Sequence, residues 1–204
     1  AGLLVIRPFL LILLPGEKIP PMNEVIFGFL LSGYLGLTYT QFGYACHGSH
    51  FDGLLARAVS PRSMVRAQLV TFVGLCAIPL ALLGPLVAGV RPQFLAPLGS
   101  LLLYNVGVTA PMLLGLGVWA RTPLQLSQST FFNYQGTSTY HFFAVLPIMG
   151  LPVGLVVGTG LSTTLLIAAG LGVLGLLAVP LWTRGLGRLL REQRHAMATG
   201  FRDE

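Results

Sequence analysis

The sequence has little charge of either sign, and acidic residues are the scarcest charged group. Of 204 residues, 9% are charged, with 6 aspartates and glutamates against 12 lysines and arginines. In a soluble domain about a quarter of the residues are charged. Hydrophobic residues make up 54% of the chain, and its mean hydropathy is +0.79. This balance excludes an ordinary soluble domain and predicts a protein of the lipid bilayer.

Other absences narrow the function. The sequence has no G-x-x-x-x-G-K-[ST] phosphate loop, and its one lysine is Lys18, so we do not expect this chain to be an enzyme that hydrolyses nucleotide. The two cysteines, Cys46 and Cys76, do not predict a disulfide framework. The basic residues are not interleaved with aromatic ones, which argues against nucleic acid as a partner.

Long apolar runs predict an all-α polytopic membrane protein with about six transmembrane helices, forming a single domain over residues 1–204. The candidate spans are 26–46, 68–90, 95–119, 142–158 and 161–182. A sixth apolar run, 2–14, is shorter and carries Arg7. We expect this run to be the end of a span that begins in a longer chain.

The arginines predict how these spans are oriented. If the spans alternate, nine of the 12 basic residues, at 57, 62, 66, 121 and in the tail, fall on one side. The positive-inside rule makes that side cytoplasmic and leaves Lys18 and Arg91 on the other. We therefore expect a multi-pass protein of the bacterial inner membrane with both termini of this segment in the cytoplasm. Residues 184–204 should form a basic cytoplasmic helix that continues from the sixth span and lies at anionic headgroups.

Small residues recur every four positions in two of the predicted spans. This spacing lets a neighbouring backbone approach closely and predicts helix contacts. Six spans cannot alone enclose a path and bury both stripes, so we expect a second copy or a second half. The run AAGLGVLG at 168–175 is a further candidate for such a helix contact, although a chain with 26 glycines also produces this spacing by chance. The two stripes are Gly28, Ser32, Gly36 and Thr40, and Gly150, Gly154 and Gly158.

The segment 49–66 lies between the second and third predicted spans. Phe51, Leu54, Leu55 and Ala58 follow the i, i+3, i+4, i+7 spacing of an amphipathic helix. Ser60 followed by Pro61 predicts the capped start of the next helix. We expect a short helix along the cytoplasmic surface, and periodicity alone leaves open that it only anchors the loop in the headgroup region.

Several motifs in this region resemble known transporters. FDGLLARAVSPRSMVRAQ resembles the coupling segment of permease subunits in ABC exporters of the ABC-2 class. YTQF, HFDGLLARAVS, NYQGTS and HAMATGFR more closely resemble the carboxy-terminal part of a bacterial family assigned to ABC-transporter permeases, over about residues 24–202. The resemblance implies a permease subunit that docks onto a separate ATPase, which would hold ATP and Mg. The docking residues that it implies are Phe51, Asp52, Leu54, Leu55 and Arg57.

Polar residues at membrane depth are candidates to line a translocation path between subunits. Hydrogen bonding between helices is the alternative role for such residues. The candidates are Tyr34, Thr38, Gln41, Tyr104 and Asn105.

Two other classes of function stay open. His47, His50, Asp52 and His141 fall at the predicted cytoplasmic interface and could ligate a metal in a membrane-embedded enzyme. With only 4 histidines in the chain, we assign no metal ligand and no catalytic residue. A structural membrane subunit without transport is the third class, and it would have no ATPase partner.

Overall fold

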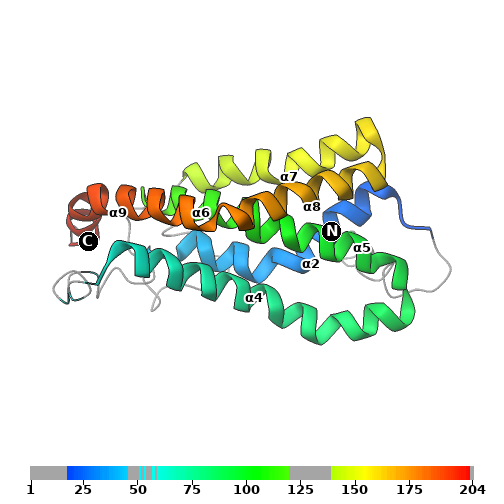
Figure 1. The fold of residues 1–204 in the computed structure, drawn as a ribbon, viewed down its shortest axis with the longest axis horizontal. Helices are drawn as coiled ribbons and strands as arrows, with labels where there is room; N and C mark the ends of the chain where they lie inside the picture. The colour runs from blue at the N-terminus through cyan, green and yellow to red at the C-terminus, as the bar shows by residue number, and fades with distance from the viewer. Residues whose placement is uncertain are drawn as a thin grey trace.

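The fold was analysed in a computed structural model, which describes residues 18–45, 51, 53, 57, 59–119 and 139–202. Within these ranges the regular structure is entirely helical (Figure 1). The elements are α2 (Pro21–Phe42), α4 (Pro61–Val90), the 3₁₀ turn η2 (Pro92–Phe94), α5 (Leu95–Tyr104), the π-helix η3 (Asn105–Thr109), α6 (Ala110–Gly117), α7 (Thr139–Thr159), α8 (Leu161–Leu177) and α9 (Val179–Arg202).

The described helices are of the length and composition that a membrane protein needs. Two stretches, Pro61–Val90 and Pro92–Gly117, are long and apolar enough to cross a membrane. A third is obtained if the bent pair Leu161–Leu177 and Val179–Phe201 counts as one span. The structure thus confirms that the described residues are helical and provide two or three candidate spans, which is compatible with a multi-pass membrane protein.

The stretch formed by α5, η3 and α6 lies at the centre of the bundle. It contacts α2 on one side and α8 on another, while α4 runs along the outside for the whole length of the molecule (Figure 1). Leu101, Tyr104 and Leu113 of the central stretch are fully buried. In contrast, α4, α7 and α8 expose large apolar side chains such as Leu82, Val157 and Leu166. Apolar side chains exposed in this number suit a lipid environment better than water.

Proline marks two of the helix boundaries. Helix α4 begins at Pro61, as the predicted cap indicated, because Ser60 caps it and Pro61 occupies its first position. The apolar run predicted as a span at 68–90 forms the rest of this helix. The predicted span 161–182 ends early, since α8 stops at Leu177 and α9 starts at Val179 with a bend of 65°. Pro180, which cannot donate a backbone hydrogen bond, lies directly after the break. The basic tail is helical as predicted, but it leaves α8 at an angle.

Candidate functional site

The segment 49–66 contacts the carboxy-terminal helix at one end of the bundle. Phe51 is only 1% exposed, and its ring packs edge-on against Phe201 of α9 with the ring centroids 5.3 Å apart. Phe51 shares a core cluster with Val65 of α4 and with Leu190 and Met197 of α9. We predicted Phe51 on a docking face, but the structure buries its ring between α4 and α9, where a large aromatic side chain gains most from burial.

The other predicted docking residues divide into two groups. Arg57 is exposed, and its backbone N–H donates a hydrogen bond of 3.1 Å to the Gly53 carbonyl. Asp52, Leu54 and Leu55 lie outside the described residues, so their docking role stays a prediction.

A hollow of about 450 Å³ opens beside Phe51, between the start of α4 and α9. Phe51, Met64 and Leu190 give it apolar walls, and Arg191 and Arg194 contribute two exposed guanidinium groups. No acidic residue lines it among the residues that the structure describes. We call this feature the docking hollow.

The start of α4 adds to the positive charge around the docking hollow. Ser60, which lines the hollow, accepts a hydrogen bond of 3.1 Å from the backbone N–H of Ser63, as the predicted cap requires. The first backbone N–H groups of a helix carry a partial positive charge. This arrangement favours a ligand or partner segment that combines an apolar side chain with a carboxylate or phosphate.

The residues predicted to line a translocation path do not face one another. Tyr34 is 60% exposed, and Thr38, also exposed, donates a hydrogen bond of 2.9 Å to the Tyr34 carbonyl on the outer face of α2. Tyr104 and Asn105 are buried inside the bundle. The side chain of Gln41 lies outside the described residues. The structure does not bring these residues to one face of the chain, and a path between two subunits that they would line stays a prediction.

Tyr104 and Asn105 instead join helices by hydrogen bonds. The Tyr104 hydroxyl donates to the Ile148 carbonyl of α7 over 3.0 Å. Asn105 Nδ2 donates to the Phe29 carbonyl and to Ser32 Oγ of α2, each over 3.0 Å. A buried amide in an apolar bundle must find such partners, because leaving it unsatisfied costs about 1–3 kcal/mol. Both side chains thus form hydrogen bonds between helices, the alternative role that the sequence analysis gave for them.

The contact between η3 and α8 is a feature that the sequence did not predict. A Cβ added at Gly107 would meet the backbone of Gly172, and one added at Gly175 would meet the backbone of Gly107. The two helices thus touch backbone to backbone where η3 interrupts the α-helical pattern. Buried Oδ1 of Asn105 and Oγ1 of Thr109 have no hydrogen-bond partner in the described structure. Gly172 and Gly175 belong to AAGLGVLG, the run whose spacing was also explained by chance.

The two predicted small-residue stripes have different surroundings. Gly28, Ser32, Gly36 and Thr40 are all buried, with Gly28 facing Pro97 and Leu101 of α5 and Gly36 facing Phe72 and Cys76 of α4. This stripe packs helices of the same chain. Gly150, Gly154 and Gly158 of α7 have no atom within 4 Å of an added Cβ. Among the described residues, that second stripe has no helix packed against it.

Metal ligation is not supported by the part of the chain that the structure describes, in which no group of three histidine, cysteine, aspartate or glutamate side chains could hold an ion. His47, His50, Asp52 and the side chain of His141 lie outside that part.

Comparisons with known proteins give the chain a family but no activity. No curated protein and no solved structure matches it. One family, described as a family of unknown function (DUF5687), matches residues 6–204. Since this match covers nearly the whole chain, the protein belongs to the DUF5687 family of unknown function.

Proposed function

We propose that this chain is the transmembrane permease subunit of an ATP-driven ABC exporter. It crosses the bacterial inner membrane about six times and couples to a separate ATPase through the 49–66 segment. ATP and Mg are held by that ATPase, and the chain itself contributes the membrane path for a substrate of unknown class. The proposal rests on the resemblance of the 49–66 segment and on the docking hollow that this segment forms with α9.

The docking hollow is the observation that carries the proposal. It has the apolar walls and the cationic rim that a groove-and-anchor contact between subunits uses. Arg191 and Arg194 lie at its rim and would meet an acidic residue on the ATPase. A loop that only anchored in the headgroup region would not need to enclose such a hollow with a second helix.

A continuous set of contacts leads from the 49–66 segment to the middle of the bundle. Phe51 packs on Phe201 of α9, and across the α8–α9 break Trp182 Nε1 donates a hydrogen bond of 3.1 Å to the Gly175 carbonyl. Gly175 in turn touches Gly107 of η3. Because packed interiors deform little, movement of the segment by an ATPase would shift α9 and α8 against η3. This chain of contacts supports coupling as a hypothesis.

The free stripe on α7 supports a second permease copy or half. Gly150, Gly154 and Gly158 leave room for a helix from outside the chain, and the neighbouring Val157 is 77% exposed. A cysteine introduced at Gly154 should crosslink two copies in membranes. The same cysteine at Gly28, which is already packed against α5, is the matched control and should not crosslink.

The experiment that tests the function is co-purification of the ATPase with variants of the docking hollow. Arg191→Glu with Arg194→Glu reverses the charge of the rim without removing buried atoms, so the chain should fold and lose the ATPase. Arg188→Glu is the control, since Arg188 is exposed on the same helix but does not line the hollow. If the double variant retains the ATPase and its substrate-stimulated turnover, the hollow is not the docking site.

A further inference from the structure

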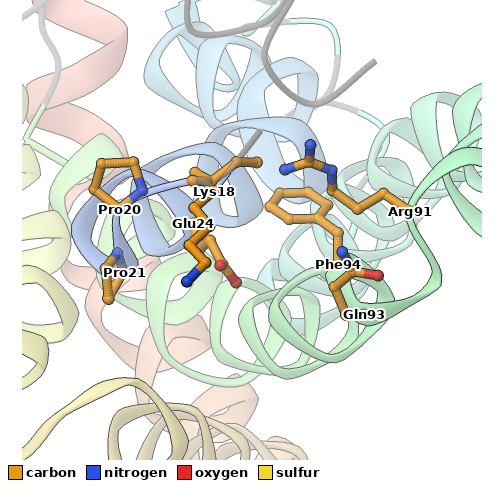
Figure 2. A pocket seen from close by; sticks show the side chains of 8 residues that line it. Lys18, Pro20, Pro21, Glu24, Arg91, Gln93 and Phe94 are labelled. Atoms are coloured by element: carbon orange, nitrogen blue, oxygen red, sulfur yellow. The ribbon is translucent and has the colours of Figure 1, made fainter. Parts of the chain in front are cut away.

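A second cavity, of about 610 Å³, lies at the other end of the bundle from the docking hollow. It is enclosed by the residues that lead into α2 and by the turn that follows α4. Figure 2 shows Lys18 and Glu24 on one side of this cavity and Arg91, Gln93 and Phe94 on the other. A volume of this size falls in the range of pockets that bind small organic ligands, about 300–1,000 Å³.

The charged groups of the cavity favour an anion. Arg91 is only 5% exposed, and its planar guanidinium matches the geometry of a carboxylate or phosphate. Lys18 is exposed at the opposite side. Glu24 is the one acid that lines the cavity among the described residues. Among the described lining residues, two cations, Lys18 and Arg91, therefore stand beside a single acid, which favours a singly charged anion as the ligand.

The environment of Glu24 makes its negative charge easier to neutralise. Burial raises the pKa of Glu24 above its ordinary value, and the nearby positive charge of Arg91 opposes this rise. Glu24 lies before the apolar run at 26–46, in the region that meets the membrane surface in our assignment. Its tendency to become neutral increases the excess of positive charge in the cavity.

The rest of the lining is apolar. Ile19 and Phe94 are buried and pack in one cluster with Phe27 and Val87 beneath the cavity. Pro20 and Pro21 complete the wall on the α2 side and offer no backbone N–H to a ligand. A small hydrated ion would leave this apolar surface unused, whereas an anion attached to an apolar body would cover it.

We infer that this cavity binds a monoanionic phosphate ester with an apolar body, held between Lys18 and Arg91. An anionic phospholipid of the surrounding leaflet supplies this chemistry, and a free phosphate is the other source. The inference rests on the membrane placement of α4 in the proposed function, not on transport or on an ATPase. It concerns the opposite end of the molecule from the docking hollow, so the two proposals fail separately.

The test measures lipid binding to the delipidated full chain in detergent by native mass spectrometry. Phosphatidylglycerol should bind more tightly than phosphatidylcholine of the same acyl chains, whose headgroup has no net charge. Lys18→Gln should weaken phosphatidylglycerol binding about fivefold, which corresponds to one basic residue at an anionic headgroup. Glu24→Gln should strengthen it, because this change removes the one negative charge while keeping the shape of the side chain.

Two controls separate this site from general attraction to a basic protein. Arg66→Gln removes one exposed positive charge near the other end of α4, at a residue that lines neither cavity, and should leave the preference for phosphatidylglycerol unchanged. Arg91→Lys keeps the charge of the buried side chain and should retain selectivity for the anionic lipid if the chain folds. Lys18→Gln concerns an exposed side chain, so the test does not depend on the folding of an Arg91 variant.

The source of the phosphate is distinguished by competition with inorganic phosphate. If the lipid is the ligand, inorganic phosphate should displace phosphatidylglycerol only in large excess, since it cannot cover the apolar wall. Displacement at equal concentrations would assign the site to free phosphate. Equal binding of the two lipids, unaffected by Lys18→Gln and Glu24→Gln, would overturn the proposal.

Discussion

The backbone contact between the end of α5 and α8 makes a quantitative prediction for a single methyl group. In Gly172→Ala the new Cβ would meet the carbonyl group of Leu103 and the backbone nitrogen of Tyr104. Backbone atoms in a packed helix cannot move aside as a flexible side chain can, so the two helices must separate. Overpacking of this kind costs about 1–3 kcal/mol. For a protein of this size, each kcal/mol lowers the unfolding midpoint by about 2–4 °C.

The matched control lies half a turn away on the same helix. Gly170 is exposed, and a Cβ there would meet no atom within 4 Å. Gly170→Ala should leave the midpoint unchanged or raise it, because alanine is favoured over glycine in a helix by up to about 1 kcal/mol. The measurement is thermal unfolding of the purified full chain in detergent, followed by loss of the monodisperse chromatographic peak. Equal midpoints for the two variants would refute the close contact between α5 and α8.

Three further predictions concern other parts of the chain. Asn105→Ala should lower the free energy of unfolding by about 1–3 kcal/mol, because it removes both hydrogen bonds to α2 and leaves the Phe29 carbonyl buried without that donor; an unchanged midpoint would contradict this. His195→Cys, on the exposed face of α9, should not react with an impermeant external thiol reagent in intact cells, and reaction there would reverse the proposed orientation. Phosphatidylglycerol affinity should rise as the pH falls through the raised pKa of Glu24, because protonation removes the negative charge that Glu24 places beside the bound headgroup; this pH dependence should be absent in Glu24→Gln.

The sequence predicted the helices better than their contacts. Apolar runs of about 20 residues indicate helices regardless of what surrounds them, and the Ser60–Pro61 cap fixed the start of α4 locally. The sequence prediction missed the bend before Pro180, because apolar residues continue through the break. The predicted span therefore ran on to Trp182, although α8 ends at Leu177. Local signals therefore located most of the helices, whereas the π-helix η3 and the angle between α8 and α9 required the assembled structure.

The candidate sites were harder to predict than the helices, because the spacing of residues along a helix does not show which other helix packs against them. The stripes containing Gly28 and Gly150 have the same period of four, yet one is buried and the other is open. The contact of Phe51 with Phe201 joins residues that are far apart in the sequence, and no periodic pattern relates them. The π-helix at Asn105 likewise depends on its fit to α8 rather than on a local motif.

The length of α4 relates the two cavities to the membrane. The first residue of α4, Pro61, lines the docking hollow. Arg91, which directly follows the last residue of α4, lines the second cavity, which also contains Lys18 and Glu24. A helix of 30 residues is about 45 Å long, close to the thickness of a bilayer that includes both headgroup regions, about 40–45 Å. If α4 crosses the membrane with little tilt, both cavities lie at headgroup level on opposite surfaces. The guanidinium groups of Arg191, Arg194 and Arg91 then lie where phosphate groups and water meet the protein, rather than in hydrocarbon, where a charged side chain is costly.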